Sequence, residues 1–198
     1  MRFLLNILLT VWLSFLTAAV VQSHRAADWS SLKGLDAATG KEAPADILDR
    51  MEQAVWRRNA AMELSEADVN RYLARIVSAR QGTATAPFAR FERVALDFEP
   101  GLCRVWFSWH IEGTSIQETA MLCFTVERRG ENFIIEPSNG AYGRLPVFRG
   151  MMCAVMPALT SLCTALDDEI HTVFQMNQLR FGKDKVTLDP RSETGSKT

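Results

Sequence analysis

Residues 91–136 read FERVALDFEPGLCRVWFSWHIEGTSIQETAMLCFTVERRGENFIIE, and apolar and polar residues alternate along most of this stretch. Alternation with a period of two is typical of strands with one buried face. Three pairs of residues that favour hairpin turns interrupt the pattern: Pro100-Gly101, Gly113-Thr114 and Arg129-Gly130. The stretch therefore predicts four antiparallel strands in a meander.

These turns set a register in which apolar residues meet across one face of the sheet. A slip of one residue in the pairing would move every one of these side chains to the other face of the sheet. The register is therefore supported by the fact that apolar residues face apolar residues in the predicted pairs. On that other face, Asp97 meets Arg104 with opposite charge. The predicted apolar pairs are Phe98 with Cys103, Leu96 with Val105, Val94 with Phe107, Cys103 with Phe124, Val105 with Leu122, Phe107 with Ala120, Val126 with Phe133 and Phe124 with Ile135.

Helices are predicted on both sides of the meander in the sequence. An amphipathic helix runs from Pro44 to about Asn59. A second begins at Glu66, where Ser65 and Asp68 approximate a capping box. The elements expected after the meander are an extended piece within 141–148, an apolar helix over 151–166 with Pro157 in its middle, a short helix over 167–176 and a hairpin over 179–188.

The length and composition indicate one domain. The chain has 198 residues, of which 47% are hydrophobic, enough for one core and too few to assume two. We predict an α+β fold in which an antiparallel meander sheet of four to six strands packs against helices. The expected boundaries are a signal peptide or membrane anchor at 1–23, a tether at 24–43, a single α+β domain at 44–190 and a disordered tail at 191–198.

The segment from Phe3 to Val21 carries no charge and follows Arg2. Its length is close to the ~20 residues that a membrane-spanning helix needs and exceeds a usual signal-peptide core of about 7–15. Small residues before His24 also permit cleavage, although we favour retention. We therefore expect a single-pass protein of the cell membrane with its C-terminal domain in the periplasm or outside the cell, or a secreted protein if the segment is cleaved.

The net charge argues against nucleic-acid binding, and the positions of the cysteines limit which disulfides can form. A formal net charge of -1 leaves no basic excess for nucleic-acid binding. Cys103 and Cys123 lie on opposite faces of neighbouring strands in the predicted register, so they should not form a disulfide. Buried free thiols are one alternative, and a pairing such as Cys103 with Cys163 is the other.

No motif for catalysis or for phosphate or metal binding is present. His110 lies on the polar face of its strand without an aligned Asp. His171 follows Asp167 by four residues, which places both on one helix face and suits a metal, but an acidic first helical turn explains the same residues. We expect no catalytic residue, no cofactor and no metal.

The second face of the predicted sheet is more apolar than an antiparallel sheet requires. Trp106 and Met121 are register partners there, and such a face is normally polar. Either a helical layer covers it, or it lines a groove for an acyl chain or a partner. The residues expected to contact such a ligand are Trp106, Met121, Ile134, Met152 and Met156.

Residues 64–73 read LSEADVNRYL, and they precede the meander, the turn Gly143-Arg144-Leu145-Pro146, the apolar helix and the last hairpin. With the amino-terminal anchor, this order of elements resembles the YpmS-like and LmeA-like envelope proteins over about residues 64–189. The resemblance implies a membrane-anchored or secreted protein that binds lipid through a curved sheet and helices. It implies no catalytic residues.

Two functions remain open from the sequence. The first is a noncatalytic cell-envelope protein that binds a lipid or another hydrophobic ligand between the sheet and the apolar helix. The second is an interaction module that docks another envelope protein through the face of Trp106 and Met121. The partners expected are accordingly the membrane, a lipid ligand and an envelope protein, with no nucleic acid.

Overall fold

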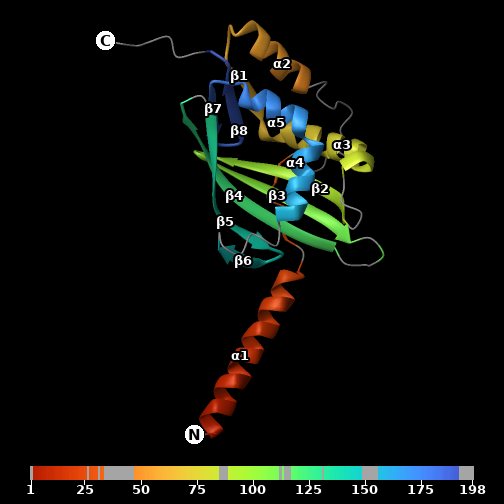
Figure 1. Ribbon diagram of the computed structural model, residues 1–198, viewed down its shortest axis with the longest axis vertical. Coiled ribbons are helices and arrows are strands. Elements are labelled where there is room, and N and C mark those ends of the chain that lie inside the picture. The colour runs from red at the N-terminus through yellow and green to blue at the C-terminus, as the bar shows by residue number, and fades with distance from the viewer. Residues whose placement is uncertain are drawn as a thin grey trace, which may run out of the picture.

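The computed structural model describes residues 2–25, 27–30, 32–33, 47–84, 89–111, 113, 117–130, 132–148 and 156–191. Within them the chain forms a five-stranded antiparallel sheet, a three-stranded sheet and helices, so the fold is α+β as predicted (Figure 1). The elements in chain order are α1 (Arg2–Ser23), α2 (Ile47–Arg57), β1 (Met62–Ser65), α3 (Glu66–Ala84), β2 (Ala89–Glu99), β3 (Leu102–Ile111), β4 (Gln117–Arg129), β5 (Asn132–Tyr142), β6 (Leu145–Phe148), α4 (Met156–Ala165), α5 (Asp167–Phe174), β7 (Gln178–Gly182) and β8 (Lys185–Asp189).

The large sheet has the order β2-β3-β4-β5-β6, which confirms the meander. Its first two hairpins have the predicted register, in which Leu96 pairs with Val105 and Val105 pairs with Leu122. Gly101 and Gly113 lie in the two turns with φ of 75° and 80°, a backbone conformation that glycine adopts without strain.

The third hairpin differs from the predicted register by two residues. Val126 pairs with Ile135 rather than with Phe133, and Arg129 pairs with Asn132. The turn therefore begins at Gly130, whose φ of 66° suits the first central position of a primed turn. Because the shift is two residues, every side chain stays on its predicted face.

The pairing of β4 with β5 continues beyond the predicted meander. The strand β5 runs on through residues 137–140 and includes the first residues of the extended piece predicted within 141–148. Phe124 pairs with Pro137 and Leu122 with Gly140, and the register shifts between these pairs. This irregularity accommodates a proline, which cannot donate a hydrogen bond to the ladder.

The smaller sheet has the order β1-β8-β7. Its hairpin confirms the predicted pairs of Phe181 with Val186 and Leu179 with Leu188. The sequence pattern does not indicate β1, which has only four residues and pairs with β8. The hydrogen bonds that join the two sheets run from Gly101 N to Phe181 O and from Asp184 N to Phe98 O, each at 3.0 Å.

The helix α3 begins at the predicted residue, and its capping box is confirmed. Ser65 Oγ accepts a hydrogen bond from Asp68 N at 3.2 Å and donates one to Asp68 Oδ2 at 2.7 Å. The helix α2 ends at Arg57, two residues before the predicted end near Asn59, and its predicted start at Pro44 lies outside the described residues. This helix lies at the end of the molecule farthest from α1 (Figure 1), and its Trp56 is 86% exposed.

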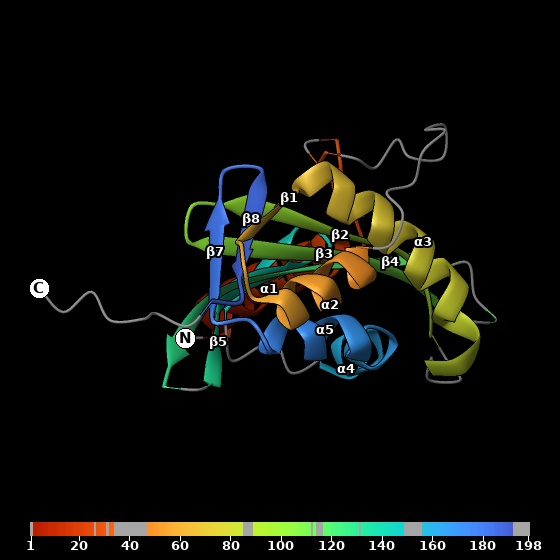
Figure 2. The same ribbon diagram turned by 90° about the horizontal axis from the view of Figure 1, so that it is seen from above.

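The large sheet has two different faces. Helices α2, α4 and α5 lie on one side of it, and α3 lies along β2 (Figure 2). The main core joins Leu162 of α4 to Val105 and Leu122; we call this side the first face. The opposite side, which carries Trp106 and Met121, is the second face. The described part of the predicted apolar helix is α4, which spans Met156–Ala165, and residues 151–155 of the prediction lie outside the described residues.

The N-terminal helix α1 projects away from both sheets (Figure 1). Its segment Phe3–Ser23 is long and apolar enough to cross a membrane, as a membrane anchor or a signal sequence would be. Three hydroxyl side chains in it donate to carbonyl groups of the same helix, which reduces their cost in lipid. These bonds are Thr10 Oγ1 to Asn6 O, Ser14 Oγ to Thr10 O and Thr17 Oγ1 to Leu13 O, at 2.8, 2.9 and 2.8 Å.

Candidate functional site

The second face carries a row of apolar side chains across all five strands of the large sheet. Successive register pairs join Ala95 to Trp106, Trp106 to Met121, Met121 to Ala141 and Ala141 to Pro146. We call these five residues the apolar row. Neighbouring strands lie about 4.8 Å apart, so the row extends over roughly 19 Å.

One end of the apolar row is covered by Trp29. The ring centroids of Trp29 and Trp106 lie 6.1 Å apart, with 54° between the ring planes. Ala95, at this end, has no exposed surface, whereas Met121 is partly exposed and Pro146 is exposed. The apolar row is therefore closed at β2 and open at β6.

Trp29 belongs to a segment that crosses the second face from β4 to α3. We give the name strap to the described residues of this segment, 24–25, 27–30 and 32–33. Ala27 N donates to Thr119 Oγ1 on β4 at 3.2 Å, and Leu32 is buried. These residues fall in the segment that we interpreted as a tether, but they are bound to the domain.

Two buried polar residues of α3 fasten the end of the strap to the edge of β2. Asn70 Nδ2 donates to the carbonyl oxygens of Lys33 and Leu96 at 2.8 and 2.9 Å, and Asn70 Oδ1 accepts from Leu96 N at 2.7 Å. Glu66 accepts from Phe98 N at 3.0 Å and from Lys33 N at 3.3 Å. The two side chains thus satisfy backbone groups that a sixth strand would otherwise pair.

Polar side chains lie on both sides of the apolar row. On one side, Arg104 donates to Glu99 at 2.7 and 2.9 Å and to Asp97 at 2.8 Å, and these carboxylates raise the pKa of the Arg104 guanidinium. On the other side, Ser108 is buried. Neither Ser108 Oγ nor Trp106 Nε1 has a hydrogen-bond partner in the described part of the chain. Buried polar atoms of this kind commonly bind a water molecule or a ligand.

The end of α1 is built into the turn between β5 and β6. Arg144 N donates to the carbonyl oxygen of Gln22 at 2.9 Å. Gly143 lies so close to the carbonyl oxygen of Ser23 that a Cβ atom there would overlap it. The helix and the domain therefore meet without a free linker between them.

The carboxylate of Glu118 on β4 contacts His24, the first residue of the strap. Glu118 is buried, and its Oε1 lies 3.0 Å from His24 Nδ1. Burial, together with the same carboxylate, raises the pKa of Tyr142 to about 12. The phenol therefore stays protonated near neutral pH.

The structure confirms that Trp106 and Met121 are register partners on the second face. Ile134 shares this face, but it lies opposite Glu127, near the turn between β4 and β5. It is therefore remote from the apolar row along β5.

The structure does not test the position of the two methionine side chains that were predicted to join them. Met152 lies outside the described residues. Met156 begins α4, and this helix packs on the first face through Leu162. Of the elements that the structure describes, the strap, and not the apolar helix, covers Trp106. Sequence patterning could not reveal this because the strap has no periodicity.

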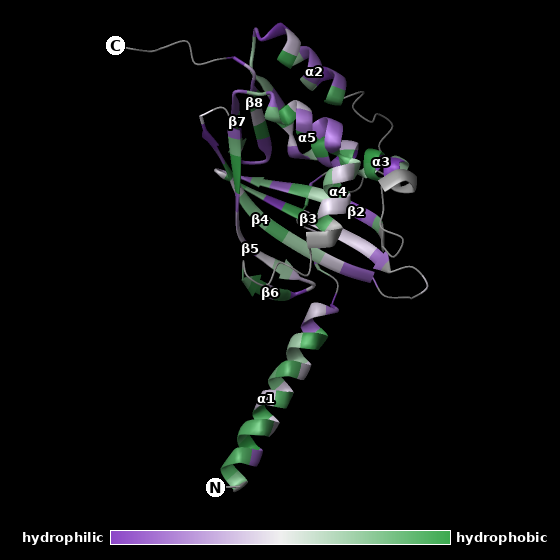
Figure 3. Ribbon diagram, viewed as in Figure 1, coloured by the Kyte–Doolittle hydropathy of each residue, from purple (hydrophilic) through white to green (hydrophobic). Residues whose placement is uncertain are grey.

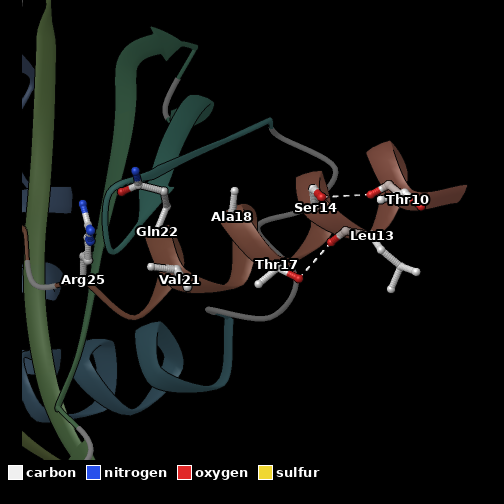
Figure 4. A pocket seen from close by; sticks show the side chains of 8 residues that line it. All are labelled: Thr10, Leu13, Ser14, Thr17, Ala18, Val21, Gln22 and Arg25. Carbon is white, nitrogen blue, oxygen red and sulfur yellow. Dashed lines mark hydrogen bonds between the residues drawn. The ribbon is translucent and has the colours of Figure 1, made fainter. Parts of the chain in front are cut away.

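Two hollows are formed by described residues. One of about 620 Å³ lies alongside α1 and ends at Gln22 and Arg25, beside the domain (Figure 4). The other, of about 490 Å³, lies where the turn between β4 and β5 meets the start of β7, and its lining includes Arg128, Phe133 and Arg180. Neither includes a residue of the apolar row.

The candidate residues for catalysis do not converge. His110 pairs with Gln117 in the sheet, and His171 is exposed on α5. No group of three or more His, Cys, Asp or Glu side chains that could hold a metal occurs among the described residues.

The cysteines are free thiols where the structure describes them. Cys103 and Cys123 lie on opposite faces as predicted, and Cys163 is exposed, while Cys153 lies outside the described residues. Burial raises the pKa of the two buried thiols, Cys103 and Cys123. They therefore resist forming the thiolate that nucleophilic catalysis needs.

No family model matches this chain, and a search of curated proteins returns no significant match. The two features that bear on function are therefore the geometry of the second face and the contact of α1 with the turn between β5 and β6.

Proposed function

We propose that this chain is a noncatalytic, membrane-anchored protein of the cell envelope that binds a lipid or another hydrophobic ligand along the apolar row. The helix α1 is retained as the anchor, and the domain lies outside the cytoplasm. The ligand lies on the second face, beside the strap, and not between the sheet and α4.

The observation that carries the proposal is the direction of the apolar row. It begins at β6, the strand beside the end of α1, and leads across the sheet to Trp106 (Figure 1). A track of roughly 19 Å suits an extended acyl chain, and its open end lies where a chain would leave the bilayer. Apolar surface that water would otherwise contact is buried when such a chain binds.

The unpaired polar atoms at the closed end favour a ligand with a polar head. Ser108 Oγ and Trp106 Nε1 can both donate a hydrogen bond, and neither has a partner in the described part of the chain. An acceptor such as a carboxyl or ester oxygen would satisfy them once the ligand displaces the side chains that now cover these buried atoms. A fatty acid or an acyl ester therefore fits this face better than a plain hydrocarbon.

Native mass spectrometry of the full chain, extracted in a mild detergent, tests the proposal. We expect lipid adducts on the wild type and their loss in Met121→Glu, because a charge on the row opposes an acyl chain. Ile135→Glu is the matched control, since Ile135 is apolar and 51% exposed on the first face.

A second variant separates loss of the ligand from loss of the fold. Ala141→Phe keeps the row apolar but fills it, so it should also lose the lipid while circular dichroism stays unchanged. A wild-type protein free of lipid, or equal loss of lipid in the Ile135→Glu control, would show that the apolar row is not the site.

The function as a docking module predicts a different occupant of the same face. Trp29 already covers Trp106, so a protein partner would have to displace the strap or bind only the open end. For this reason the lipid ligand is the function that the geometry supports better.

A further inference from the structure

The contact of Gln22 and Ser23, at the end of α1, with the turn between β5 and β6 fixes the height of the domain above a bilayer. We call this contact the anchor junction. The apolar segment Phe3–Ser23 has 21 residues, which at 1.5 Å per residue is about 31 Å of helix. The hydrocarbon core of a bilayer is about 30 Å thick, so α1 uses its whole length to cross and leaves the core close to Ser23. Gly143 and Arg144, which contact Gln22 and Ser23, therefore lie at the lipid interface.

The strand that follows this turn is unusual for a strand surrounded by water. The edge strand β6 pairs only with β5, so its outer edge has no neighbouring strand in the described sheet. Its Phe148 is 81% exposed, and the whole strand is apolar (Figure 3). With only four residues and Pro146 among them, β6 has an edge that is poorly suited to pairing with another strand, so the exposed feature that remains is the large apolar side chain of Phe148.

The position of β6 indicates what covers it. It contacts α1, and it lies at the end of the domain that faces the helix (Figure 1). Arg25, which ends the hollow beside α1, is exposed at the same junction and is suitably placed for lipid phosphates (Figure 4). An apolar strand beside a cation is typical of a surface that lies in the bilayer interface.

We propose that β6 is a membrane-docking edge, which places Phe148 among the lipid headgroups and acyl chains and holds the domain against the bilayer surface. The proposal rests on the proposed retention of α1, but it does not require a ligand on the apolar row. With β6 in contact with the bilayer, the open end of the row meets the membrane directly.

Photocrosslinking of the full chain in phosphatidylglycerol and phosphatidylethanolamine nanodiscs tests the proposal. The photoreactive phenylalanine analogue benzoylphenylalanine replaces Phe148 in one sample and Phe174 in the other. Phe174 is the matched control because it is also an exposed phenylalanine, 42% exposed, on α5 away from the anchor. We expect lipid adducts at position 148 and none at position 174, with the protein folded in both cases because both side chains are exposed.

Each of the other outcomes contradicts a different part of the proposal. Adducts between two copies of the chain at position 148 would show that a second copy covers β6. Lipid adducts at neither position, or at both equally, would overturn the docking edge while leaving ligand binding on the apolar row untouched. Intact mass of the purified chain shows whether α1 is present, and its loss would remove the premise of the docking edge.

Discussion

Asn70 illustrates how much of this fold depends on single polar side chains. It has no exposed surface and makes three hydrogen bonds, two to Leu96 and one to Lys33. Asn70→Ala leaves buried backbone groups of Leu96 unpaired, and we predict a loss of about 3 kcal/mol in the free energy of unfolding. Denaturant unfolding measures this loss. Asn132→Ala, at an exposed position, should change it by less than about 0.5 kcal/mol, and equal effects would contradict the role of Asn70.

Gly143 offers a test of the junction between helix and domain. Gly143 and Gly101 both have positive φ, 59° and 75°, so alanine at either position costs about 1–2 kcal/mol in backbone strain. Only at Gly143 would the added Cβ also press on the carbonyl oxygens of Ser23 and Arg25. We predict that thermal unfolding of the full chain in detergent occurs at a lower temperature for Gly143→Ala than for Gly101→Ala. Equal shifts would mean that the junction is not rigid.

Glu66 and Asn70 were missed as key residues, although the sequence contained a signal for them. They continue, at helical spacing, the stripe of Leu73 and Val77, which are buried. A polar residue within an apolar helical stripe indicates a buried hydrogen-bond partner. The identity of that partner, the outer edge of β2, could not be derived because it lies more than 20 residues away along the chain.

At the level of elements, the capping box of α3 makes stability depend on pH. The hydrogen bond from Ser65 is the main cause that lowers the pKa of Asp68 in the folded chain. The pKa of Asp68 is lower in the folded chain than in the unfolded chain, where it is about 4, so the ionised carboxylate stabilises the fold at pH values above about 4. This stabilisation is lost as the pH falls through the pKa of the folded chain. We predict that wild type exceeds Asp68→Asn in stability at neutral pH and that the difference shrinks below about pH 4. Stability curves that stay parallel in acid would refute this.

The strands show why some elements were predictable and others were not. The first two hairpins followed from apolar pairing and from the turn residues around Gly101 and Gly113, because both signals are local. The third turn was placed one residue early, since a two-residue shift leaves the faces unchanged and therefore leaves no trace in the pattern. The strap and β1 contain too few residues to show a period, and only tertiary contacts define them.

On the scale of the whole molecule, the second face connects the anchor to the sheet. The prediction that Trp106 and Met121 share an apolar face away from the main core is confirmed, but the element that covers this face was not foreseen. Pairing across strands can show that a face of the sheet is apolar, but it does not identify the segment of the chain that covers that face. The strap and the open end at β6 together make this face a track that leads from the end of α1 to Trp106.

The most direct test of ligand binding on this face is photocrosslinking in native membranes with a photoreactive residue in place of Met121. Met121 is partly exposed near the middle of the apolar row, and Ile135 on the first face serves as the control position. We predict a covalent lipid adduct at position 121 and none at position 135. An adduct to another protein at position 121, or no lipid adduct there, would contradict the proposal that the apolar row binds a lipid.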